Sequence, residues 1–241
     1  MASDYANEYP SGFDHLNLLL ERLKTDLRPP LQLVLFTISF LGFQTICLAQ
    51  IEHPREVFDK AVSDFKKGRI EESVFSFDRL VKLEPSALPQ LWQRGIALYY
   101  AGRFKDCRAQ FESHRLVNPN DVENAAWHFL CVARAASPAK ARNALLPVGP
   151  DSRVPMKQIY QMFRGDLSVE QVLEAGGSSP EGQFYAELYA GLYLEVLGDG
   201  ERALKHIRNA AADHYSRSGY MHDVARVHRD LLARRGGSTK P

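Results

Sequence analysis

Two segments of the chain repeat one another: AVSDFKKGRIEESVFSFDRLVKLEP (61–85) and GIALYYAGRFKDCRAQFESHRLVNP (95–119). The residues that shape turns and helix contacts recur at an interval of 34: Gly68 with Gly102, Arg69 with Arg103, Phe77 with Phe111, and Pro85 with Pro119. A fixed period of this size is typical of stacked structural repeats, each of which is too small to bury its apolar face alone. We therefore expect helix–turn–helix units in series over residues 54–121.

Each copy carries the residue types that a compact helix pair requires. A small residue midway along the expected first helix, Ala61 or Gly95, allows the second helix to approach closely. The glycine permits the turn, and the proline ends the unit because it cannot continue a helix. A further small residue, Ser73 or Cys107, stands four positions before the recurring phenylalanine.

This arrangement resembles the tetratricopeptide repeat (TPR), a family of 34-residue helix pairs. The resemblance covers 68 residues well. It implies an all-α fold, a right-handed α-solenoid of stacked antiparallel helix pairs. Some positions depart from the family pattern: its large aromatic opener is Val57 or Leu91, its following leucine is Lys60 or Arg94, and a usual tyrosine is Asp64 in the first copy. The resemblance is specific for the fold and not for a function.

After residue 121 the register continues in weaker form, so residues 52–235 are expected to form one TPR-like repeat domain. Helical spacing of apolar residues predicts further helices at 121–135, 155–163, 168–175, 184–197 and 220–235. The small pair Ala190-Gly191 is followed by Ala203 and Ile207, which repeats the pattern of the first two copies. The last helix is suited to capping the open end of a solenoid. Residues 236–241 are expected to be a disordered tail.

The composition limits the classes of function. With 241 residues, 45% hydrophobic and 24% charged, the chain has the composition of an ordinary globular protein of one or two domains. A net charge of +1 argues against a general nucleic-acid binder, which usually has a strong basic excess. The three cysteines, Cys47, Cys107 and Cys131, show no CxxC spacing and predict neither a metal site nor a disulfide framework. Cys107 and Cys131 are expected to be small buried residues on helices.

The N-terminal part contains an unusual uncharged run, Pro29 to Ile51, after a polar extension at 1–28. Three interpretations remain open. A membrane span needs about 20 apolar residues, which this run barely provides. A secretory signal fits Arg28 before the run and Cys47-Leu48-Ala49 as a cleavage-like site. A helix buried on all sides would be equally apolar. We expect a signal or anchor at 29–51, hence an exported or membrane-associated protein, with a cytoplasmic protein as the alternative.

No catalytic, cofactor-binding or metal-binding motif is found. The sequence lacks a nucleophile elbow, a phosphate-binding glycine loop and a metal-ligand pair. Four histidines gather near the C-terminus, at 206, 214, 222 and 228, with gaps of eight, eight and six. Ligands on one helix stand three or four residues apart, so these histidines are expected to be packed or solvated. We expect a protein that is not an enzyme and has no cofactor.

The candidate binding site is the concave face that stacked helix pairs create. If the chain follows the family, the first helix of each repeat lines this face. The side chains expected to contact a partner are Trp92, Ile96, Tyr99, Tyr100, Trp127, Leu130 and Arg134. Aromatic anchors suit a peptide, and Arg134 can pair with both oxygens of a carboxylate. The alternative is that many of these aromatics are core between repeats, or are covered by the chain's own later helices.

These observations favour a non-enzymatic protein–protein interaction scaffold, an adaptor that binds a partner peptide on its concave face. Two alternatives belong to other classes. One is an enzyme or ligand-binding protein that uses a polar pocket in the C-terminal third. The other is a self-associating structural subunit whose aromatic surface is its own interface. The partner is expected to be a protein or peptide and not a nucleic acid, with membrane association through residues 29–51.

Overall fold

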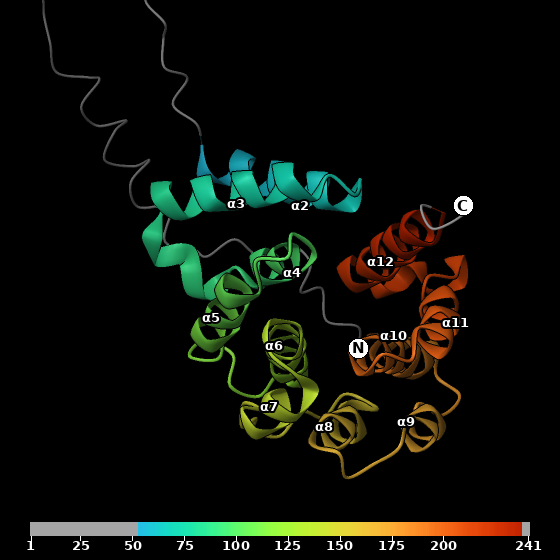
Figure 1. The fold of residues 1–241 in the computed structure, drawn as a ribbon. Helices are drawn as coiled ribbons and strands as arrows, with labels where there is room; N and C mark the ends of the chain where they lie inside the picture. Colours follow the sequence, from blue (N-terminus) through green and yellow to red (C-terminus); the bar gives the residue numbers. More distant parts are fainter. Residues whose placement is uncertain (1–52, 238–241) are drawn as a thin grey trace, which may run out of the picture.

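The computed structural model describes residues 53–237, and every regular element in that range is a helix (Figure 1). The predicted segments 1–28 and 29–51, and the tail beyond 237, lie outside the described residues. Within 53–237, no helix has the length and apolar character needed to cross a membrane. The helices are, in chain order, α2 (Pro54–Lys66), α3 (Ile70–Leu83), η2 (Pro85–Gln90), α4 (Trp92–Tyr100), α5 (Phe104–His114), α6 (Val122–Ala135), α7 (Pro138–Asn143), α8 (Met156–Arg164), α9 (Val169–Ala175), α10 (Pro180–Leu197), α11 (Gly200–Ala210), η3 (Asp213–Ser218) and α12 (Tyr220–Gly237).

The expected helix pairs form at both copies of the quoted repeat. Helix α2 packs on α3, and α4 packs on α5. Gly68 and Gly102 make the two turns with φ of 71° and 73°, the left-handed region that glycine enters without steric cost. At Gly95 the helices are so close that a Cβ atom would lie 2.6 Å from the ring of Phe111. The small residue is therefore required by the contact between α4 and α5.

The same contact recurs in the C-terminal part. A Cβ atom added at Gly191 of α10 would lie 2.7 Å from Ile207 of α11. Gly191 and Ile207 stand 16 residues apart, as do Gly95 and Phe111. The packing of α10 on α11 thus repeats that of α4 on α5, although little sequence identity remains.

The two quoted copies differ at their first helices. Helix α2 begins at Pro54, whereas α4 begins only at Trp92, the position equivalent to Phe58. The preceding residues form the 3-10 segment η2, which contains Pro85 and Pro89. Because proline offers no backbone N–H and blocks the preceding helical turn, Pro89 delays the start of α4.

The helices follow a curved path that brings the two ends of the described chain together (Figure 1). Helices α2 to α6 succeed one another along one side, α7 to α9 form the turn, and α10 to α12 return on the other side. Helix α12 thereby contacts α2. Helix α12 ends at Gly237, two residues beyond the boundary expected from the sequence.

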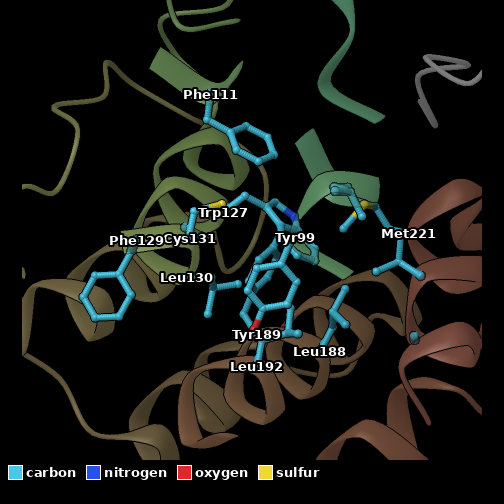
Figure 2. Close-up of a cluster of buried hydrophobic side chains, with 14 of the residues drawn as sticks. Tyr99, Phe111, Trp127, Phe129, Leu130, Cys131, Leu188, Tyr189, Leu192 and Met221 are labelled. Carbon is cyan, nitrogen blue, oxygen red and sulfur yellow. The ribbon is translucent and has the colours of Figure 1, made fainter. Parts of the chain in front are cut away.

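Helix α6 lies at the centre of the core. Eleven of its fourteen residues are buried, because α5 covers one side and α10 and α8 cover others. Figure 2 shows Trp127, Phe129 and Leu130 of α6 among side chains of α4, α5 and α10. This burial on all sides distinguishes α6 from the first helix of a repeat that faces an open concave surface.

The expectation that the cysteines form no disulfide is wrong. Cys107 of α5 and Cys131 of α6 are joined, with their Cα atoms 5.9 Å apart, a usual separation for this bond. Both are fully buried on helices, as expected. The pairing could not be recognised from the sequence because the two residues stand 24 positions apart with no recurring motif, and only the packing of α5 on α6 brings them together.

Candidate functional site

The side chains expected to bind a partner fall into two groups. Ile96, Tyr99, Trp127 and Leu130 are buried, with at most 5% of each residue exposed. In this arrangement none of these four presents a contact surface to another protein. The remaining three, Trp92, Tyr100 and Arg134, are partly exposed. The face that was expected to form an aromatic groove is covered by the chain's own helix α12, which contacts Trp92 and Tyr100.

Helix α12 is the element that lies in the groove. The ring of Tyr220, at the start of α12, meets Trp92 edge to face at 5.1 Å and stacks on Phe65 of α2 at 5.5 Å. Two turns further along, His228 lies 2.9 Å from the hydroxyl of Tyr100. The pairs Trp92–Tyr220 and Tyr100–His228 are each separated by 128 positions. Helix α12 therefore runs beside α4 in the same direction. We call the contact of α12 with α2 and α4 the seam.

A chain of polar groups crosses the seam at its C-terminal end. His228 Nδ1 faces the Tyr100 hydroxyl, and His228 Nε2 lies 3.1 Å from a carboxylate oxygen of Glu195 on α10. The other oxygen of Glu195 lies 2.5 Å from the guanidinium of Arg134 on α6. Arg134 Nε also donates to the Tyr99 hydroxyl at 3.2 Å. We call Tyr100, His228, Glu195 and Arg134 the latch.

The electrostatics of the latch fix the protonation states of Glu195 and Tyr100. Burial raises the pKa of Glu195, but the hydrogen bond and charge of His228 and the charge of Arg134 outweigh it, giving about 2. Burial raises the pKa of Tyr100 well above its usual value, so its hydroxyl stays protonated. The Tyr100 hydroxyl and His228 Nδ1 share one hydrogen bond, and the tautomer of the imidazole decides which of them donates. The latch thus joins α4, α6, α10 and α12 through close contacts between polar side chains.

A pocket of about 100 Å³ opens beside the latch. It is lined by Tyr99, Tyr100, Gly102, Phe104, Arg134, Glu195, His228, Leu231 and Leu232. The side chain of Arg134 is 30% exposed, so its guanidinium reaches solvent while it holds Glu195. Such a group attracts a carboxylate, and the planar fork can bind both of its oxygens. This is where Arg134 was expected to act.

A second pocket, of about 80 Å³, lies at the seam between the turn after α2 and the outer side of α12. Lys66, Gly68, Asp230 and Arg234 are among its lining residues. Lys66 also forms an ion pair of 3.2 Å with Asp223 of α12. The seam therefore borders two cavities, and its ion pair is accessible to solvent.

The clustered histidines serve separate contacts, and none shares a partner with another. His206 pairs with Glu187 at 2.7 Å, and His222 meets the carbonyl oxygen of Ala212 at 3.0 Å. Among the described residues, no group of three or more His, Cys, Asp or Glu side chains is placed to hold a metal ion.

A third charged cluster holds the irregular segment before α8. The guanidinium of Arg153 contacts Asp121, Glu123 and Asp151 at 2.6 to 2.7 Å. Tyr189 of α10 donates to Glu123 at 2.6 Å. Burial, with the nearby Asp121, raises the pKa of Glu123 to about 7. The partly exposed Arg153, with the three acids around it and Tyr189, joins this segment to α6 and α10, which is a structural role.

Sequence reasoning missed Tyr220 and Glu195 as parts of the site. Tyr220 was recognised as the start of an apolar stripe suited to capping, but the stripe does not say which surface it covers. Glu195 stands among apolar residues near the end of α10, and a charged residue in such a place was the available signal. A comparison with models of known protein families finds none that matches this chain.

Proposed function

We propose that the chain is a TPR-like right-handed α-solenoid that acts as a non-enzymatic scaffold for a protein partner, with the site at the seam. The single observation that carries this proposal is the pocket beside the latch, where Arg134 keeps a partly exposed guanidinium among aromatic rings. Aromatic rings and arginine are the residue types that dominate binding energy at protein interfaces. The recurring spacing of Gly95 with Phe111 and of Gly191 with Ile207 supports the solenoid.

The chemistry of the latch supports binding more than catalysis. A catalytic acid or base needs a pKa near the working pH and access to a ligand. Tyr100 keeps its proton because burial raises its pKa, and Glu195 stays ionised with a pKa of about 2. Both groups are engaged with His228 and Arg134, so the latch fixes helices in place.

The test compares two arginine variants of the intact chain in affinity capture from its native host, with quantitative mass spectrometry. Arg134→Ala removes the guanidinium from the pocket, and Arg208→Ala removes an exposed arginine from α11 as the matched control. We expect Arg134→Ala to reduce capture of a specific protein at least tenfold, about 1.4 kcal/mol, and Arg208→Ala to leave it unchanged. Equal capture by both variants, with both chains folded, would contradict the site.

We further propose that the chain folds in an oxidising compartment, as an exported or membrane-associated protein does. The disulfide between Cys107 and Cys131 supports this, since such bonds are rare where glutathione keeps thiols reduced. Fractionation and N-terminal sequencing of protein from its host would test the signal or anchor expected at 29–51. A chain that begins near Met1 in the cytosol, with both thiols free, would contradict it.

A further inference from the structure

The contacts of α12 indicate what kind of element the groove at the seam accepts. We propose that this groove, formed by Phe65, Lys66, Trp92 and Tyr100, receives an amphipathic helix of the partner protein in place of α12. That helix carries an aromatic ring and an acidic residue in the positions of Tyr220 and Asp223. This inference rests on the proposed function and specifies the recognised element of its partner.

The first step is the shape of the groove. Helix α12 places Tyr220, Val224 and His228 in one row, four residues apart. The first meets the rings of Phe65 and Trp92, and the last meets Tyr100. Residues four positions apart lie on one face of a helix, and an amphipathic helix binds a groove through such a face. The groove therefore has the length and spacing that fit a helix.

The second step is that α12 fits this groove imperfectly. Tyr220 is buried, at 7% exposure, and its hydroxyl has no hydrogen-bond partner among the described residues. A buried hydroxyl without a partner is destabilising, because it loses its hydrogen bonds to water and gains none in the fold. A phenylalanine at this position would keep both ring contacts and avoid that cost. A partner helix that presents phenylalanine is therefore favoured over α12 at this point.

The third step is the charge that selects the helix. Asp223 lies 3.2 Å from Lys66, and its side chain is 22% exposed. An ion pair open to solvent adds little stability, but an opposite charge at this position repels. Lys66 thus discriminates between helices with an acidic and a basic residue three positions after the aromatic ring.

The fourth step is the connection of α12 to the rest of the chain. Gly219 joins η3 to α12 with φ of 63°, a conformation that favours glycine. The two pockets border the seam at Tyr100 and at Lys66. Both pockets lie along the C-terminal half of α12, so release of α12 from α2 and α4 begins at that end, while Gly219 is the joint about which α12 turns.

The test uses the full chain and a fluorescent peptide that copies residues 219–234 with Tyr220→Phe. In the wild-type chain α12 competes for the groove at a high effective concentration, so binding is weak. The chain variant Asp223→Lys places two positive charges against each other and loosens α12, while the peptide keeps its aspartate. Asp213→Lys is the control, because it makes the same charge change at an exposed position of η3.

We expect the Asp223→Lys chain to bind the peptide at least tenfold more tightly than the wild-type and Asp213→Lys chains. A peptide that also carries Asp223→Lys should lose this binding, and the chain variant Lys66→Asp should restore it. Circular dichroism shows whether each chain remains folded. The proposal would be overturned if the Asp223→Lys and Asp213→Lys chains bound the peptide equally well. It would also be overturned if a peptide with the same residues in scrambled order bound the Asp223→Lys chain as tightly.

Two further outcomes separate this inference from the proposed function. If the peptide does not bind but Arg134→Ala still abolishes capture of a native partner, the partner uses the pocket without replacing α12, and the inference is wrong. If the wild-type chain is a stable dimer that exchanges α12 between copies, the groove serves self-association, which overturns the inference as well.

Discussion

The joint between α4 and α5 and the seam between α12 and α4 both hold a helix against the same element, yet they are built differently. At the joint, Gly95 and Phe111 stand 16 residues apart and meet through apolar atoms at close range. At the seam, α12 meets residues of α4 that stand 128 positions away through rings and a hydrogen bond, and it meets α2 through an ion pair. Pockets flank the seam, and the Tyr220 hydroxyl is unsatisfied. We therefore expect the local repeat joints to be more stable than the seam, and the seam to open first.

The disulfide should give the largest effect on the repeat region. Replacing both Cys107 and Cys131 by alanine removes a cross-link between α5 and α6, which should lower the free energy of unfolding by about 2–4 kcal/mol. Denaturant titration measures this change. The wild-type chain should lose the same amount in reductant, and the double variant should be insensitive to reductant. A wild-type chain unaffected by reductant would show that the bond does not support this joint.

The close contact of α4 with α5 provides the next largest effect. Gly95→Leu should destabilise the chain by about 1–3 kcal/mol, because the new side chain clashes with the ring of Phe111. Gly191→Ala adds only a Cβ atom against Ile207, instead of a whole leucine side chain, and should cost less. Gly200→Ala is the control, since an added Cβ there meets no atom within 4 Å. An unchanged melting temperature for Gly95→Leu would contradict the register of the repeats.

The cluster around Arg153 should make the stability of the irregular segment depend on pH. The pKa of Glu123 in the folded chain is about 7, above the value of about 4.3 for an exposed glutamate. Between these two pKa values the folded chain keeps a proton on Glu123 that the unfolded chain releases. Protonation of Glu123 therefore stabilises the fold at low pH, and this stabilisation is lost as the pH rises through 7. Glu123→Gln should reduce the pH dependence between pH 5 and 8 by about 1–2 kcal/mol. Identical pH profiles for the two chains would show that Glu123 is ionised in the fold.

The smallest effect is expected at the seam. Tyr220→Phe removes the unsatisfied hydroxyl and keeps the ring, so it should stabilise the chain by up to about 1 kcal/mol. Calorimetry would record this as a rise in Tm of about 2–4 °C. Tyr189→Phe is the matched control and should destabilise, because its hydroxyl donates to Glu123. A loss of stability for Tyr220→Phe would mean that the hydroxyl has a partner that holds the seam.

The part of the fold that the sequence predicted is the part made by local contacts. Gly68, Gly102 and Gly95 act within one helix pair, so their types and spacing reveal the turn and the close approach. The all-α class, the first helix pairs and the positions of most later helices followed from such signals. The late start of α4 did not, because the effect of Pro89 depends on how the preceding turn closes.

The candidate site was predicted only in part, for a physical reason. The sequence placed Tyr100 and Arg134 on one face, where they do line a pocket. It also placed Trp127 and Leu130 there, and these are buried because α10 and α12 return over them. Whether an apolar face remains open depends on how separate helices pack on one another, which a helical period does not encode. The Cys107–Cys131 bond was missed for the same reason.

Native-state hydrogen exchange of the full chain, followed by mass spectrometry, tests most directly whether the seam is the joint that opens. Amides of α12 and of the end of α2 should exchange through a partial opening that costs less free energy than global unfolding. Amides of α4, α5 and α6 should exchange only with global unfolding, and His228→Ala should accelerate exchange in α12 and at the end of α2 but not in α5 or α6. If α12 exchanges at the same free energy as α5 and α6 in both the wild-type chain and the His228→Ala variant, the seam is not the joint that opens.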